Sequence, residues 1–239
     1  MKVAVEISGQ PRVSTLTTAF ARSFVNCDSV DWYVHFWSEN TPNKKIQSQW
    51  LLPQDQAWVR GKFEQNLPPG HRLIAYAHSA APTVDATNIS AYHCNASDVL
   101  VMWQGWLRAN DLRLASSETY DFVVKGRVDA PIKGRIDFQT MAKDAISITT
   151  GVWDPDCFEE PRDRRVKQRF ADSVFVGPPA LMNEAVRVGE RLEIVKDLKE
   201  FHPDLSMIHY LNCLNIPVVR NYWDTGLHYP APWGDWIDR

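Results

Sequence analysis

The stretch from Tyr120 to Pro131 constrains the fold of this chain more than any other. It opens with three consecutive β-forming apolar residues, Phe122, Val123 and Val124. An unbroken apolar run of this kind is typical of a strand covered on both faces, as in a parallel sheet. Charged residues then occupy every second position: Lys125, Arg127 and Asp129. In an extended chain this spacing places all three on one face.

Two cations and a carboxylate on one face favour a ligand site at the end of this strand. Burying them in a core would cost free energy, whereas the carboxyl ends of parallel strands line the crevice in which α/β proteins bind ligands. In the functional interpretation, Lys125 and Arg127 bind an anionic ligand and Asp129 binds a cation. Pro131 then ends the strand pairing. A surface strand end with a local ion pair fits the same residues, so both interpretations stay open.

The composition indicates a globular protein. The chain has 239 residues, which suits one large α/β domain or two small ones. Hydrophobic residues make up 44% of the chain, enough for a substantial core, so disorder is not expected. The net charge of -3 gives no indication of a protein that coats nucleic acid. We therefore expect no nucleic-acid partner.

The cysteines and the apolar runs indicate a cytoplasmic location. The four cysteines are widely spaced and form no Cys-x-x-Cys pair, which suits free thiols in a reducing compartment: Cys27, Cys94, Cys157 and Cys213. The apolar run from Met1 to Ile7 is too short for a signal peptide. No run approaches the roughly 18 apolar residues that a transmembrane helix needs, so we expect no transmembrane segment.

The N-terminal residues predict a strand, a loop and a helix. Lys2–Ile7 is rich in valine and isoleucine, and Thr15–Val25 has apolar residues at helical spacing. The loop between them contains four candidate ligand-binding residues: Ser8, Gly9, Gln10 and Arg12. Free amides at a helix start attract phosphate, and Arg12 adds positive charge. The loop has one glycine, so it is neither a dinucleotide fingerprint nor a P-loop, and a plain strand-to-helix turn also fits.

The rest of the chain alternates predicted strands with predicted helices. The further strands are Val30–Trp37, Arg72–Ala77, Ala145–Thr150, Phe170–Pro178 and Pro217–Arg220. The further helices are Gln54–Gln65, Ala96–Leu114, Phe138–Lys143, Pro179–Leu198 and Pro203–Asn215. Alternation of this kind predicts an α/β fold with a largely parallel sheet. We expect one domain over residues 1–239, with a nucleotide-binding half at about 1–130 and an acceptor or lid half at about 131–239.

Four segments carry a resemblance to a known family. In chain order they are Val3–Arg12, Tyr120–Asp129, Ala171–Gly177, and Pro203–Leu211 leading into Ile216–Arg220. Together they resemble bacterial and viral sugar transferases of the GT-A type. The resemblance implies a GT-A-like, Rossmann-type sandwich in which helices flank a central, mostly parallel mixed sheet. It also implies a nucleotide-sugar donor and a glycan or other hydroxyl acceptor.

The resemblance also implies a divalent metal, with one departure from the family pattern. The family commonly holds Mn²⁺ or Mg²⁺ with an Asp-x-Asp motif, but the matching residues here are Arg127, Val128 and Asp129, so the first acid is missing. Either Asp129 binds the ion with the diphosphate and water completing the shell, or Arg127 takes over part of the metal's charge. A late histidine, His228, matches the family's second metal ligand, although an exposed tail histidine fits as well.

Asp172 is the candidate catalytic base in this interpretation. An inverting transfer needs a carboxylate that takes the acceptor proton, and Asp172 lies in a segment that resembles the family. A structural role for Asp172, as a cap or as a partner of Arg169, stays open. Three cations suit the stabilisation of the leaving diphosphate: Arg12, Lys125 and Arg127.

Two other functions fit the same features. One is a non-catalytic protein that binds nucleotide sugars on the same fold, which the missing acid favours. The other is a nucleotidyltransferase, although the usual glycine-rich basic loop is absent near the N-terminus. The sequence leaves open the nucleotide, the sugar, the acceptor, the stereochemical outcome and the oligomeric state.

Overall fold

The computed structural model describes residues 1–9, 23–38, 55–91, 94–127, 135–150, 170–196, 198, 201 and 203–221. A seven-stranded sheet lies at the centre, in the order β4-β3-β1-β5-β8-β7-β9. Its strands are β1 (Lys2–Gly9), β3 (Ser29–Trp37), β4 (His71–Ser79), β5 (Phe122–Arg127), β7 (Ile146–Thr150), β8 (Phe170–Gly177) and β9 (Val218–Asn221). All neighbouring pairs are parallel except those of β8, which runs antiparallel to β5 and β7. The predicted α/β fold with a mostly parallel mixed sheet is therefore confirmed.

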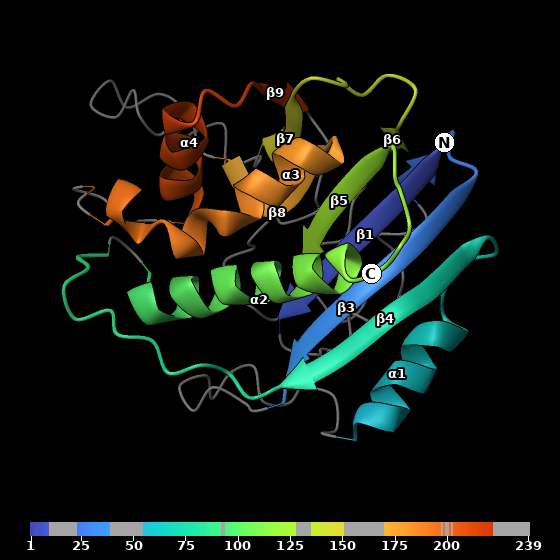
Figure 1. Ribbon diagram of the computed structural model, residues 1–239, viewed down its shortest axis with the longest axis horizontal. Helices are drawn as coiled ribbons and strands as arrows, with labels where there is room; N and C mark the ends of the chain where they lie inside the picture. The colour runs from blue at the N-terminus through green and yellow to red at the C-terminus, as the bar shows by residue number, and fades with distance from the viewer. Residues whose placement is uncertain are drawn as a thin grey trace, which may run out of the picture.

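Helices cover both faces of this sheet. The longer helices are α1 (Gln56–Gln65), α2 (Ala96–Leu114), α3 (Pro179–Ala185) and α4 (Pro203–Cys213). In Figure 1, α2 crosses the face formed by β5, β1 and β3, and α3 and α4 lie on the same side, over the other half of the sheet. Residues of α1 pack on the opposite face. Among the helices that the structure describes, none has both the length and the apolar character that a bilayer crossing demands.

Two apolar clusters, one on each face, follow from the alternation of side chains along the strands. Ala4 of β1 and Val123 of β5 pack with Trp103 and Trp106 of α2. The intervening strand residues pack on the other face with α1: Val3, Val5, Phe122 and Val124. The unbroken apolar run at the start of β5 therefore contributes side chains to both clusters, as expected for a strand that is covered on both sides.

The predicted helix Ala96–Leu114 is confirmed with the same bounds. Asn95 precedes it in an extended conformation, and its side chain accepts a hydrogen bond from the Ser97 amide at 3.0 Å. This bond satisfies one of the amides that a helix start leaves without an intrahelical partner. The helix connects β4 to β5, which lie in the same sheet with the same direction, as the strand–helix–strand pattern predicts.

Two predicted helices are wrong where the structure describes them. Phe24–Val25, the end of the predicted helix Thr15–Val25, is a short strand, β2, which pairs in parallel with β6 (Ile136–Asp137). The predicted helix Phe138–Lys143 is a series of turns and bends. Asp137 explains the second error, because its carboxylate accepts from the Gln139 amide at 3.0 Å and its carbonyl from the Thr140 amide. Such local bonds compete with helix formation.

The segment after β8 is only partly α-helical. The predicted helix Pro179–Leu198 is α-helical over α3 and continues as two 3-10 helices, η6 (Val186–Glu190) and η7 (Leu192–Ile194). Close packing accompanies this change, because a Cβ added to Gly189 would lie 3.1 Å from Cβ of Trp103 on α2. The sequence has no local signal for this contact, which depends on a helix far away in the chain.

Candidate functional site

The carboxyl ends of the parallel strands meet at one edge of the sheet, here called the carboxyl edge. Ser8 near the end of β1 pairs with His35 of β3 on one side and with Arg127 of β5 on the other. β8 runs the other way and enters the sheet at the same edge, where its Val174 pairs with Gly126. Open α/β sheets bind ligands in the crevice outside this edge, so it is the candidate site.

Most of the predicted ligand residues belong to strands that end at the carboxyl edge or follow them. Ser8 and Gly9 are the last two residues of β1, and Gly9 has a φ of 132°, a conformation that glycine adopts without strain. Arg127 is the last residue of β5 and Asp172 the third of β8; the structure describes only their backbones. Four predicted site residues lie outside the described residues: Gln10, Arg12, Asp129 and His228.

The middle of α2 lies directly over the end of β1. A Cβ added to Gly105 would lie 3.2 Å from Oγ of Ser8 and 3.4 Å from the Trp37 ring. Gly105 is buried, and only a residue without a side chain lets the helix approach this closely. A glycine inside a strongly helical pattern is the signal that would have predicted this contact.

Lys125 lies in the interior beneath α2. Only 2% of the residue is exposed, and its ammonium lies 3.5 Å from the centre of the Trp106 ring and 5.1 Å from that of Phe175. A desolvated cation over an aromatic face gains about 2 kcal/mol. The sequence predicts that Lys125 binds an anionic ligand directly. The structure places its side chain in the interior, behind the carboxyl edge.

A second buried charge, on Glu6, adjoins Lys125. The two residues are register partners on β1 and β5. One oxygen of Glu6, Oε1, accepts from Nε of Arg113 at 2.7 Å and from the amide of Asn110 at 3.1 Å. The other oxygen, Oε2, has no hydrogen-bond partner in the described part of the chain. Burial raises the pKa of the Glu6 carboxyl, and the attraction of Arg113 offsets this only in part.

Asn183 of α3 completes the group around Glu6. Its side-chain oxygen accepts from Asn110 at 3.1 Å and also from Arg113. The group therefore joins β1, α2 and α3 through hydrogen bonds in the interior. Sequence reasoning missed it, although a glutamate inside the apolar run Val3–Ile7 was a visible signal, because such a residue is rarely buried without a partner.

His35 is the third buried polar side chain near the carboxyl edge. It is 3% exposed, its Nε2 lies 2.8 Å from Oγ of Ser79, and its ring meets the edge of Trp37. Nδ1 has no hydrogen-bond partner among the described residues. Burial, with smaller contributions from Arg108 and His78, lowers the pKa of His35 to about 4. The ring is therefore neutral at neutral pH.

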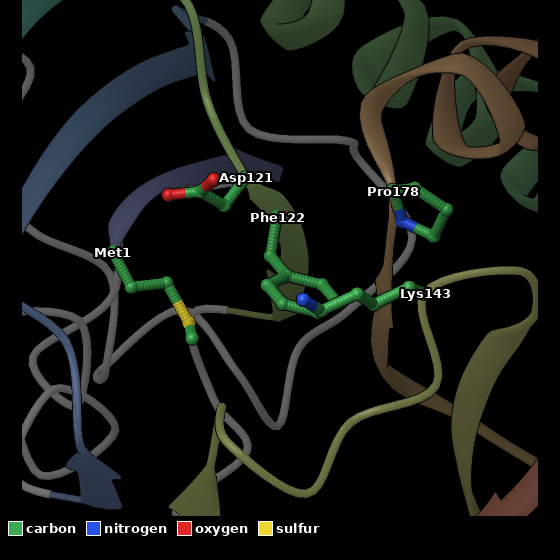
Figure 2. Close-up of a pocket in the computed structure, with 5 residues that line it drawn as sticks. All are labelled: Met1, Asp121, Phe122, Lys143 and Pro178. Atoms are coloured by element: carbon green, nitrogen blue, oxygen red, sulfur yellow. The ribbon is translucent and has the colours of Figure 1, made fainter.

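A pocket of about 360 Å³ lies at the opposite, amino edge of the sheet. Figure 2 shows its lining residues: Met1, Asp121, Phe122, Lys143 and Pro178. The carboxylate of Asp121 already accepts from the Lys2 amide at 2.7 Å, and Phe122 is 1% exposed. None of the predicted site residues lines this pocket, so we do not assign it a function.

Within the described ranges, no group of three or more histidine, cysteine, aspartate or glutamate side chains is placed to hold a metal ion. Both predicted metal ligands, Asp129 and His228, lie outside those ranges. Comparison with known proteins adds no assignment, because no protein-family model and no curated protein matches this chain.

Proposed function

We propose that this protein is a glycosyltransferase of the GT-A type, which moves a sugar from a nucleotide-diphosphate-sugar donor to a hydroxyl group of a glycan or another acceptor. The observation that carries the proposal is the pairing of Ser8 with Arg127. It joins the ends of two segments that resemble the family, although more than a hundred residues separate them in the chain.

The third resembling segment adjoins the same point, which supports the proposal further. β8 pairs with β5 through Gly126 and Val174, and the backbone of Asp172 lies two residues from that pair. Parallel strands that end together, flanked by one antiparallel strand, suit a GT-A-like sandwich. The expected ligand crevice of such a sheet is its carboxyl edge.

The donor diphosphate would bind at the end of β1. The backbone after Gly9 leads to Gln10 and Arg12, the predicted donor-binding residues, and Arg127 is the adjacent cation from β5. When the glycosidic bond of the donor breaks, negative charge develops on the diphosphate, and a guanidinium stabilises it through paired hydrogen bonds. Arg127 would therefore act mainly on the leaving group.

The acceptor hydroxyl must lose its proton as it attacks the sugar. In an inverting transfer a carboxylate takes this proton, and Asp172 is the carboxylate that we propose. β8 is an inner strand of the sheet, between β5 and β7. Residues 174–177 pair with β5, and Asp172 lies two residues beyond this ladder at the carboxyl edge, which suits contact with a ligand there.

A divalent metal is part of the proposal because the family resemblance implies one. Asp129 and His228 would hold Mn²⁺ or Mg²⁺, and a carboxylate oxygen is the ligand type that suits these ions. When bound, the ion would neutralise charge on the leaving diphosphate.

Release of nucleoside diphosphate from a panel of nucleotide sugars, with and without Mn²⁺, tests the proposal. We expect turnover by the wild-type protein and a loss of about 100-fold or more in kcat for Arg127→Gln and Asp129→Ala. Lys62→Met is the matched control, because Lys62 is exposed on α1 and its ammonium donates to Oε1 of Gln65 on the same helix.

Three other outcomes would each overturn the proposal. Binding of nucleotide sugar without turnover identifies a non-catalytic binding protein. Release of pyrophosphate from a nucleoside triphosphate identifies a nucleotidyltransferase. Absence of both binding and turnover removes nucleotide sugars as ligands.

A further inference from the structure

Lys125 is a predicted donor-binding residue whose side chain the structure places in the interior. Its ammonium lies 3.5 Å from the centre of the Trp106 ring on α2 and 5.1 Å from that of Phe175 on β8, and the residue is 2% exposed. Both rings are themselves buried, Trp106 at 2% and Phe175 at 3% exposed.

The strand register shows what Lys125 adjoins. On β1 its partner is Glu6, and on β8 its partner is Phe175. Two residues further along β1 and β5, Ser8 pairs with Arg127. Lys125 is therefore one step inside the row of residues that would hold the diphosphate. Figure 1 shows β1 and β5 side by side, with α2 crossing them.

The contact of Lys125 connects two elements of the candidate site. Its ammonium links β5 to α2 through the Trp106 ring, and α2 also lies over Ser8 at Gly105. The same helix thus contacts both strand ends that form the candidate site.

We infer that Lys125 is a positioning residue of the proposed transferase: acting through Trp106, it fixes the end of β5 against α2 and so sets the position of Arg127 relative to Ser8. This inference rests on the proposed function. It differs from direct ligand binding because it assigns the effect of Lys125 to a buried contact between two elements.

A double-mutant cycle in the full chain tests the inference. Lys125→Met removes the charge and keeps the length, and Trp106→Phe keeps a ring but weakens its attraction for a cation. Each variant is compared with Lys62→Met in kcat, in KM for the donor and in affinity for nucleoside diphosphate alone. Thermal unfolding followed by circular dichroism verifies that each variant is folded.

Positioning predicts equal and non-additive effects. We expect Lys125→Met and Trp106→Phe each to lower kcat by about 10- to 100-fold, because small displacements of reacting groups cost this much. KM should change by less than about threefold, and the double variant should be no worse than Lys125→Met, because both changes break one contact.

Direct ligand binding predicts a different result and would overturn the inference. In that case Lys125→Met alone weakens nucleoside diphosphate binding, Trp106→Phe leaves it unchanged, and the two effects multiply. An inactive wild-type protein that binds no nucleotide instead overturns the proposed function itself, so the two failures are distinguishable.

Discussion

The two ends of the interface between α2 and the sheet satisfy their buried polar groups to different extents. At the amino edge, the buried carboxylate of Asp31 accepts from Nε and Nη2 of Arg72, from the Tyr120 hydroxyl and from Lys2. Towards the carboxyl edge, Glu6 uses one oxygen for Arg113 and Asn110, while the other has no hydrogen-bond partner within the described residues.

The pKa values of the two carboxyls reflect this difference and shift in opposite directions. Burial alone would raise the pKa of Asp31, but the hydrogen bonds from Arg72, Tyr120 and Lys2 together hold it below its usual range. For Glu6, burial outweighs its partners and raises the pKa. The amino edge is therefore organised for stability. The interior behind the carboxyl edge keeps polar atoms that have no hydrogen-bond partner among the described residues, and native proteins tolerate such atoms chiefly at functional sites.

Removal of the arginine partners should give the largest difference between the two ends. Arg113→Met leaves the buried Glu6 without its cation and should lower the free energy of unfolding by about 3–5 kcal/mol. Arg72→Met should cost clearly less, because Asp31 keeps Lys2 and Tyr120 and because the Arg72 side chain is 55% exposed. Urea unfolding of both variants checks this, and equal losses would contradict the comparison.

Acid should protonate buried histidines before it protonates Asp31. Burial lowers the pKa of His35 near the carboxyl edge and also that of His71 at the start of β4. The pKa of His35 falls from 6.5 in the unfolded chain to about 4 in the folded protein, so the unfolded chain binds the proton first. The contribution of His35 to stability should therefore decline by about 3 kcal/mol as pH falls from 6.5 to 4. The raised pKa of Glu6 acts in the opposite sense, because there the folded protein binds the proton first. The lowered pKa of Asp31 acts later, because its contribution is lost only below its usual value of 3.8.

Thermal melts from pH 7 to pH 3 measure both the decline that we assign to His35 and the later decline that we assign to Asp31. His35→Asn should flatten the decline between pH 6.5 and pH 4 and leave the decline below it. A wild-type stability that is constant down to pH 4 would show that His35 accepts its proton without cost.

Neutral amide replacements should affect the two carboxylates unequally. In Asp31→Asn, an amide NH₂ group would face side chains that already donate four bonds to this position. The free energy of unfolding should fall by about 2–3 kcal/mol. Glu6→Gln should cost about 1 kcal/mol, because it keeps an acceptor for Arg113 and removes a charge that burial disfavours. Calorimetry at pH 7 compares them, and a larger cost for Glu6→Gln would reverse the interpretation.

The smallest effects on stability are expected at two helical glycines. The Cβ that Gly61→Ala adds in α1 would have no atom within 4 Å, so the higher helix propensity of alanine should stabilise the protein by about 1 kcal/mol. Gly105→Ala gains the same helix propensity, but its Cβ would lie 3.2 Å from Oγ of Ser8. This crowding should cancel the gain in stability and displace α2 from β1. Donor turnover should fall only in Gly105→Ala, and unchanged turnover there would show that Ser8 adapts.

Much of the fold follows from local patterns in the sequence. The apolar strand β5, the helix α2 and the alternation of elements were predictable because period-2 and helical spacing act over a few residues. The errors at Phe24–Val25 and Phe138–Lys143 arose where a distant strand or an aspartate side chain determined the backbone. The partner strand of Phe24–Val25 is more than a hundred residues away, so a local window does not contain it. The bonds of Asp137 are local, and the helical spacing alone did not show that they would prevail.

The sequence by itself determined which residue types stand at the strand ends, namely Ser8 and Gly9, Lys125 and Arg127, and Asp172. Only the tertiary structure decided that Ser8 adjoins Arg127 and that Lys125 lies beneath Trp106. Alternation along a strand gives the face of a side chain but not what covers that face. Here the covering element is α2, which Gly105 allows to approach closely, so a charge expected at the surface lies in the interior.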